Sequence, residues 1–424
     1  MFLHTILTII EQKYRMSKLK VLVAPGDRAG SGKFRCVDPH INLQKNFPED
    51  FFVDINHAID FNNDAYLKNY DIIFIHRIPQ HRNKEAVNII KHIKELGIKV
   101  VVDTDDHWNL DPSHGLYSIA KQEKIPETLI ECLKLADLVT VPTKILADQV
   151  ARFNKNVAVL PNAIDPTEEQ FKPKPIASDK IRFGWLGGSS HIKDIELLRG
   201  LGSAQNSISE KMQLVLCGFD TRGSVRYMDP ETKEVKERAM RPEETTWFMY
   251  ELFLTDSYKN LADDAEYLKF LTSFTDNPNV STLDKKYRRI WTRPITQYAN
   301  GYNNFDIALA PLADNEFNKY KSQLKVIEAG FHKKALIAQN YGPYTIDLVS
   351  AIKPGGEFDP NGNCLLVETS KNHKQWVKHA KKLVENPELV KQLGENLYNT
   401  VKDTYDINNV SKIRSEQYKK LKGC

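Results

Sequence analysis

The sequence predicts an α/β protein made of two doubly wound domains, each a parallel sheet with helices on both faces. Short apolar runs alternate with amphipathic helical segments along most of the chain, which is the pattern of strand–helix–strand units. The alternation stops in a segment rich in Pro and Glu that ends near Pro175, and it restarts at Ile181. With 424 residues the chain is also too long for one ordinary core, so two domains are expected.

Composition and charge narrow the class of protein. Hydrophobic residues make up 41% of the chain and charged residues 27%, which is typical of a soluble globular protein. The net charge of +4 is compatible with an anionic substrate but does not require nucleic acid. The 5 cysteines form no CxxC pair or other metal-ligand spacing, so we expect reduced thiols in a cytoplasmic protein.

Breaks in the pattern set the domain boundaries. They predict an N-terminal extension at 1–17, a first domain at 18–165, a linker at 166–178, a second domain at 179–400 with an insertion at about 220–293, and a C-terminal helix at 401–424. The extension is apolar at its start but far too short to span a membrane, and it lacks the basic start and cleavage site of a signal peptide. We therefore expect a packed or frayed helix there and no transmembrane segment.

The first domain contains six predicted strands, at 19–24, 51–53, 71–76, 98–102, 137–141 and 157–160. A glycine-rich loop with Gly30, Ser31 and Gly32 follows the first strand, and its backbone N–H groups could approach an anion or a substrate. The loop matches neither the Walker A sequence nor the GxGxxG fingerprint, and a plain tight turn is an equally good interpretation. His76 ends the third strand, where a doubly wound sheet binds ligands, and a structural cap is its simpler alternative.

The second domain begins with a strand at 181–186. Gly187 and Gly188 follow in a turn that allows close backbone approach. Lys193, in the next helix, is placed to reach an anion at that helix start. A capped helix without a ligand is the alternative interpretation.

Residues 220–293 depart from the regular alternation and are rich in charge and aromatic side chains. We predict an insertion that carries a β-hairpin near 226–234 and several helices, followed by a helical segment at 287–302. Its aromatic residues most simply form its own core. Such a surface could also bind a sugar polymer, a partner or a nucleic acid.

The segment 321–330 reads as a helix with two different faces. Leu324 and Ile327 recur at helical spacing on the core side, whereas Lys321, Lys325 and Glu328 at i, i+4 and i+7 share the other face. Two ammonium groups can hold a diphosphate, and one carboxylate can accept hydrogen bonds from two ribose hydroxyls. The helix N-terminus favours the same anion. A solvated face with a weak ion pair is the simpler alternative.

Two features of the chain resemble the GT-B glycosyltransferases, in the large group 1 type family that includes many retaining enzymes. One is the order of a strand, the helix 321–330, a second strand and the Gly342-Pro343 turn, and the other is the run 159–165 (Val-Leu-Pro-Asn-Ala-Ile-Asp). The family has two glutamates separated by seven residues and followed by Ala and Gly. Glu328-Ala329-Gly330 matches the second half, and Tyr320 stands where the first glutamate would be. The resemblance implies two Rossmann-like domains that face a cleft, with sugar transfer from a nucleotide-sugar to an acceptor.

The resemblance also implies roles for individual residues. The donor would be held by residues of the second domain: Gly187, Gly188, Lys193, Ser322, Lys325 and Glu328. The acceptor side would be lined by residues of the first domain: Gly30, Ser31, Gly32, Asp105 and Asp106. Catalytic roles would fall to His76, which could hydrogen-bond the transferred sugar or the acceptor, and to Lys193 and Lys325, which would meet the charge of the leaving group.

The expected donor is a UDP- or GDP-sugar, used as a substrate without a metal or other cofactor, and the family implies retention at the anomeric carbon. The acceptor would be a glycan, a lipid-linked molecule or another molecule. A last helix that crosses back onto the first domain is also implied for residues 401–424.

Three other interpretations stay open. Asp103-Thr104-Asp105 resembles the Asp-x-Asp motif with which GT-A glycosyltransferases hold a divalent ion. The absent first glutamate would suit an inactive GT-B-like binding protein. A GT-B enzyme that modifies nucleic acid is the third possibility, which the balanced charge disfavours.

Overall fold

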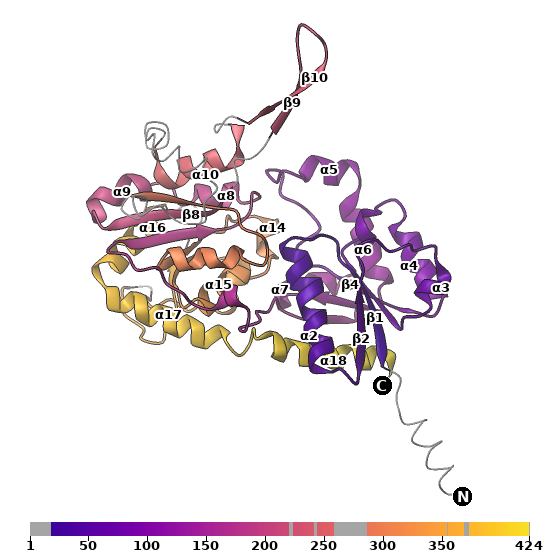
Figure 1. Cartoon of the computed structure of the whole chain (residues 1–424). Coiled ribbons are helices and arrows are strands. Elements are labelled where there is room, and N and C mark those ends of the chain that lie inside the picture. Colours follow the sequence, from indigo (N-terminus) through magenta and orange to yellow (C-terminus); the bar gives the residue numbers. More distant parts are fainter. Residues whose placement is uncertain are drawn as a thin grey trace, which may run out of the picture.

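The computed structural model describes residues 18–219, 224–240, 244–257, 286–353, 355–368 and 373–423. Within these residues the chain forms two α/β domains that lie side by side (Figure 1). The predicted extension at 1–17 and most of the predicted insertion helices lie outside the described residues. The fold class expected from the sequence, two domains with parallel sheets, is confirmed.

The first domain is a six-stranded parallel sheet with the strand order β2-β1-β3-β4-β5-β6. Its strands are β1 (Leu19–Ala24), β2 (Phe51–Ile55), β3 (Ile72–His76), β4 (Lys99–Asp103), β5 (Leu138–Val141) and β6 (Val157–Val159). Its helices include η1 (Gly32–Val37), α2 (Asp38–Asn46), α3 (Asp64–Leu67), η2 (Pro79–His81), α4 (Ala86–Glu95), α5 (Tyr117–Gln122), α6 (Ile125–Leu135) and α7 (Lys144–Val150). All six predicted strands are present.

Strand β1 shows why the strands of this sheet have apolar residues at successive positions, without alternating polar ones. Val21 and Val23 pack into a cluster with Leu43 of α2, whereas Leu22 and Ala24 pack into the cluster on the opposite face of the sheet. A strand covered on both faces needs apolar side chains at every position, not at every second one. The burial of both faces therefore follows from the sequence pattern.

The second domain has the strand order β11-β8-β7-β12-β13-β14, again all parallel. Its strands are β7 (Ile181–Leu186), β8 (Met212–Phe219), β11 (Tyr287–Trp291), β12 (Ile307–Ala310), β13 (Ala335–Gln339) and β14 (Leu365–Val367). Its helices include α8 (Ile192–Glu196), α9 (Leu201–Ile208), α10 (Thr246–Thr255), η5 (Tyr298–Asn304), α14 (Glu316–Lys319), α15 (Leu324–Phe331), η6 (Gly342–Ile346), α16 (His373–Glu385) and α17 (Pro387–Val401). A short turn of helix, η3 (Glu169–Phe171), lies in the linker.

Two predicted elements of this domain need correction. The helix expected at 287–302 is wrong over its first part, because residues 287–291 form β11, the edge strand beside β8. The helix expected at 321–330 begins only at Leu324, so Lys321 and Ser322 lie in the loop before it. The predicted hairpin is confirmed as β9 (Ser224–Met228) and β10 (Val235–Ala239), which project from the second domain (Figure 1).

The last helix, α18 (Ile407–Lys422), leaves the second domain and packs against the first, as the resemblance implied (Figure 1). The Tyr418 hydroxyl and the His40 Nε2 atom are 2.8 Å apart, and Ser411 donates a hydrogen bond to Asn42 at 2.6 Å. Arg414, also in this helix, is buried, and its guanidinium lies 5.8 Å from the centre of the Phe74 ring. Of the helices that the structure describes, none has the length and apolar character that a membrane span requires.

Candidate active site

A cavity of about 670 Å³ lies where the two sheets present their carboxyl ends to each other, and both domains contribute to its wall. From the first domain come the loops after β1 and β4. From the second domain come the turn after β7, the end of β8 and the start of α15. This is the place where doubly wound sheets bind ligands.

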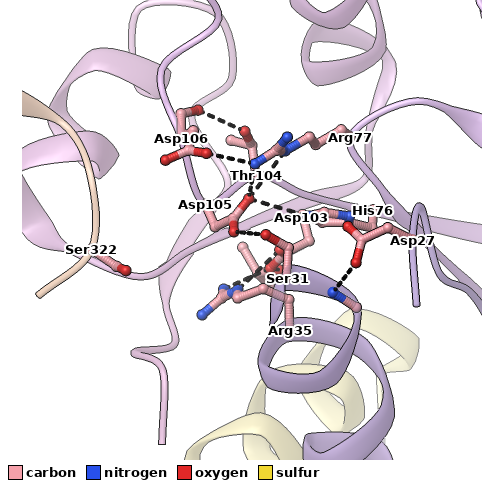
Figure 2. Close-up of polar contacts among 12 residues, drawn as sticks. Asp27, Ser31, Arg35, His76, Arg77, Asp103, Thr104, Asp105, Asp106 and Ser322 are labelled. Atoms are coloured by element: carbon pink, nitrogen blue, oxygen red, sulfur yellow. Dashed lines mark hydrogen bonds and ion pairs between the residues drawn. The ribbon is translucent and has the colours of Figure 1, made fainter. Parts of the chain in front are cut away.

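Asp105 is the central group on the first-domain wall (Figure 2). The residue is 8% exposed, and its carboxylate accepts hydrogen bonds from Ser31 Oγ at 2.7 Å, from Arg77 Nη2 at 2.6 Å and from His76 Nε2 at 3.1 Å. Burial opposes ionisation, but the Arg77 charge and the bonds from His76 and Ser31 hold the pKa of Asp105 well below its usual range. Asp105 is therefore a fixed anion at neutral pH.

The predicted acceptor-side residues are only partly brought together. Gly30, Ser31, Asp105 and Asp106 line the cavity, whereas Gly32 does not. The N–H of Gly32 donates to Asp27 Oδ1 at 2.9 Å, and a Cβ at this position would collide with the Asp27 carbonyl. This N–H is committed to the loop itself, so the expected anion cradle is not formed by Gly32.

His76 lies behind Asp105 and is not part of the cavity wall (Figure 2). It is 2% exposed, and Gly26 approaches it so closely that a Cβ there would stand 2.8 Å from His76 Nδ1. The ring donates through Nε2 to Asp105, which fixes that carboxylate. The predicted contact of His76 with a sugar or acceptor stays a prediction.

Asp103 does not fit the metal-binding interpretation. Its two oxygens receive Arg35 Nη2 at 2.6 Å and Arg35 Nε at 3.1 Å, and Thr140 Oγ1 adds a third bond at 2.6 Å (Figure 2). Asp103 and Arg35 are both fully buried and Asp103 does not line the cavity. Within the described ranges no cluster of three His, Cys, Asp or Glu side chains is placed to hold a metal ion. The Asp103–Asp105 motif is thus a structural ion pair followed by a cavity residue.

Glu328 is the buried carboxylate of the second-domain wall. It is 3% exposed and accepts hydrogen bonds from the hydroxyls of Tyr302, at 3.0 Å, and Tyr298. Burial raises the pKa of Glu328, and the two hydroxyls and Lys325 counteract that rise. The tyrosines use part of the carboxylate's acceptor capacity and leave lone pairs for a ligand.

Lys325 lies one helical turn before Glu328 and faces the same cavity. Its ammonium donates to the Leu186 carbonyl and stands 4.7 Å from the centre of the Trp185 ring. Burial lowers the pKa of Lys325 to about 8, so the side chain is still charged at neutral pH. Gly187 makes room for it, because a Cβ there would come within 2.7 Å of Lys325 Nζ.

The structure separates Lys193 from the other predicted donor residues. Its side chain is 56% exposed, pairs with Glu196 at 3.3 Å and lies outside the main cavity. Gly187, Gly188, Ser322, Lys325 and Glu328 do line that cavity. Lys193 instead borders a small neighbouring pocket of about 50 Å³.

Several cavity residues were not included in the sets inferred from the sequence: Asn162, Trp247, Arg293, Tyr298 and Lys321. The spacing within 321–330 pairs Lys321 with Lys325 as two ammonium groups that can hold a diphosphate, but the donor set implied by the resemblance does not include Lys321. Its ammonium stands 4.9 Å from the Phe317 ring and has no ion pair among the described residues. Arg293 and Tyr298 come from the segment after β11, where the sequence pattern predicts the end of an insertion and a helix.

The two domains around a shared cavity have the GT-B fold, the architecture of many glycosyltransferases. Neither a protein-family profile nor a curated protein matches the sequence. The fold is similar to that of Anabaena HepE, solved with UDP and glucose, with a TM-score of 0.58, 12% identity and coverage of 95% of this chain and 99% of that one.

Two other solved structures are similar over their whole length. They are the catalytic domain of Arabidopsis thaliana starch synthase IV bound to ADP and acarbose, with a TM-score of 0.55 and 9% identity, and α,α-trehalose-6-phosphate synthase from Burkholderia multivorans, with a TM-score of 0.55 and 10% identity. In each case the match covers 96% of this chain and 99% of the other. At these identities the likeness establishes the fold.

Proposed function

We propose that the protein is a glycosyltransferase that moves a sugar from a nucleoside diphosphate sugar to an acceptor hydroxyl. The observation that carries the proposal is the pairing, on one wall of the interdomain cavity, of the buried carboxylate Glu328 with the cations Lys321 and Lys325. A nucleoside diphosphate has the complementary chemistry, with ribose hydroxyls for the carboxylate and two phosphates for the cations. The fold supports this assignment, since similar structures hold UDP or ADP.

The same groups would act in the transfer step. As the bond to the diphosphate breaks, negative charge develops on its oxygens, and Lys321 and Lys325 are placed to stabilise that charge. The carboxylates that line the described cavity are already engaged: Asp105 and Asp106 by Arg77, Glu328 by two tyrosines, and Asp27 by the backbone N–H groups of its own loop. This arrangement supports transfer with retention without a carboxylate nucleophile, and with cationic side chains in place of a metal ion.

The first-domain wall supports a neutral acceptor. The described first-domain residues that line the cavity include the carboxylates Asp27, Asp105 and Asp106, and they include neither a lysine nor an arginine. Phosphate-rich molecules would meet this wall with like charge, whereas sugar hydroxyls can donate to carboxylates. We therefore propose an uncharged hydroxyl-bearing group, such as a neutral glycan, as the part of the acceptor that enters the cavity. A nucleic-acid acceptor does not fit this wall.

A donor panel tests the proposal. The purified protein is mixed with UDP-, GDP- and ADP-sugars, and nucleotide release is measured with neutral and phosphorylated sugar acceptors. We expect release to rise with a neutral acceptor, and Asp105→Asn to raise the acceptor KM while donor affinity stays unchanged. A protein that binds a nucleoside diphosphate but releases no sugar with any acceptor or with water would instead be a GT-B-like binding protein. Failure to bind any nucleoside diphosphate would reject the proposal.

A further inference from the structure

Tyr320 connects the donor wall to the first domain. It follows α14 in the second domain, yet its ring packs into the first domain's hydrophobic cluster beside Trp108 and is 7% exposed. The ring lies on His107, with centroids 4.7 Å apart and planes at 26°. His107 belongs to the loop after β4 that also carries Asp105 and Asp106. Tyr320 is therefore a contact between the two domains and not part of the second domain's own core.

Lys321, the next residue, is held by first-domain contacts on both sides. On its C-terminal side, Ser322 Oγ accepts a hydrogen bond from Asn162 Nδ2 at 3.0 Å. Asn162 is itself held by Arg35 Nη1, which donates to its side-chain oxygen at 3.1 Å. The backbone of Lys321 is thus fixed at two flanking positions by groups that belong to the other domain.

The side chain of Lys321 is also placed by an interdomain contact. Its ammonium stands 4.9 Å from the centre of the Phe317 ring. That ring meets His114 of the first domain edge-on, with centroids 5.6 Å apart. A flexible lysine loses conformational entropy when it binds a phosphate, and a supported backbone and ring reduce the freedom left to lose.

We propose that Tyr320 is a positioning residue for the donor site: its stack on His107 sets the place of Lys321, so the first domain helps to hold the diphosphate. The inference rests on the proposed function, because it assigns the diphosphate as the ligand of Lys321. Position 320 lies eight residues before Glu328, where the resembling family has its first glutamate. In this chain that position contributes an interdomain contact in place of a carboxylate on the donor.

The alternative is that Tyr320 only fills space in a hydrophobic cluster. The two interpretations differ in how Tyr320 and Lys321 combine. If Tyr320 acts through Lys321, removal of the lysine side chain leaves Tyr320 with nothing to position, and the two substitutions cannot add. A space-filling role would weaken binding by the same factor whether or not the lysine is present.

Calorimetry on the full chain, with UDP, GDP and ADP as probes, tests this difference. Losing a bond to a charged group costs about 1.5–3 kcal/mol, so Lys321→Ala should weaken the preferred nucleotide roughly tenfold or more. We expect Tyr320→Leu to approach the same loss and the double variant to bind like Lys321→Ala alone. Tyr320→Phe keeps the ring and should bind like the wild type. Phe153→Leu is the matched control, since Phe153 packs on the same cluster at Trp108 but makes no described aromatic contact with the second domain.

Each result has one consequence. Losses that multiply in the double variant, or an unchanged affinity in folded Tyr320→Leu, overturn the positioning role while donor binding stands. His107→Leu gives an independent arm, because it removes the other half of the stack and should reproduce Tyr320→Leu. Thermal melts of every variant show whether the measured protein is folded. A wild-type protein that binds none of the three nucleotides would overturn the proposed function itself.

Discussion

Tyr302 donates its hydroxyl to the Glu328 carboxylate at 3.0 Å, and the stacked ring of His332 stands 5.0 Å behind Tyr302. These contacts help to fix a buried carboxylate, and a buried anion is retained only if it is well bonded. The remaining acceptor capacity of Glu328 points to a ligand with hydroxyl groups. The ribose of a nucleotide is the ligand that the proposed function supplies.

Glu328→Gln should weaken nucleoside diphosphate binding roughly tenfold or more, because a bond to a charged acceptor is worth about 1.5–3 kcal/mol. The loss should vanish when the probe is a 2′,3′-dideoxynucleoside diphosphate, which has no ribose hydroxyls to bind. Glu395→Gln is the control, since Glu395 pairs with Lys333 on the surface. Calorimetry checks all three proteins. An equal loss with both probes would assign Glu328 to folding and not to ribose.

The pH dependence of donor binding should report on Lys325. Burial lowers the pKa of Lys325 to about 8, so the ammonium is charged below that pH and neutral above it. A diphosphate, whose last pKa is about 6, keeps its charge over the same range. Affinity should therefore be constant near neutral pH and fall as the pH rises above about 8.

Two variants separate Lys325 from other groups in this titration. Lys325→Arg keeps its charge and should remove the fall, because a guanidinium does not deprotonate in this range. Burial lowers the pKa of Lys334 to about 8 as well, but Lys334 does not line the cavity. Lys334→Arg should therefore leave the profile unchanged. Disappearance of the fall in Lys334→Arg, or its persistence in Lys325→Arg, would contradict the assignment.

Asp103→Asn should affect folding, not metal binding. It leaves the fully buried Arg35 without its anion, and breaking a buried pair costs about 3–5 kcal/mol of the free energy of unfolding. Urea denaturation should show a large decrease in the midpoint. Asp148→Asn, which breaks an exposed pair with Lys144 in the same domain, should leave the midpoint nearly unchanged. A stable Asp103→Asn protein that had lost Mn²⁺-dependent activity would restore the GT-A interpretation.

Sugar transfer should survive metal removal. Lys321 and Lys325 provide the positive charge that the leaving diphosphate needs, so we expect full activity in EDTA. The anomeric configuration of the donor should be retained, which NMR of the product shows directly. Activity that disappears with EDTA and returns with Mn²⁺ would show that a metal ion takes part. An inverted product would require a general base opposite the leaving group.

Most strands of the two sheets could be predicted because they are buried and apolar at nearly every position. β11 departs from this pattern, because its sequence places Arg288 and Arg289 in a buried strand. Arg289 is tolerated there because Glu251 of α10 pairs with it, a partner that lies far away in the sequence. A local pattern contains no sign of such a partner, and it predicts a helix where the structure has this strand.

The candidate site was predictable where function depends on spacing within one helix. Lys325 and Glu328 face the cavity as their spacing in α15 suggests. Lys193 lies away from the cavity because the orientation of α8 turns its side chain toward Glu196 and solvent, so its role in donor binding stays a prediction. Tyr298 reaches Glu328 only because η5 packs against α15, which depends on the tertiary arrangement. The spacing of Tyr298 and Tyr302, four residues apart, is the one local sign in the sequence that the two side chains could contact the same group.

The crossing helix has a consequence for how the protein is made. The first domain is closed on one side by Tyr418 and Arg414, side chains that are translated about 250 residues after its last strand. Domains usually fold as they emerge, at ~5–20 residues per second, so this domain waits roughly ten to fifty seconds with the face around His40 uncovered. Its final packing has to wait until α18 (Ile407–Lys422) has left the ribosome. The domain that is translated first is therefore expected to be the last to complete its packing.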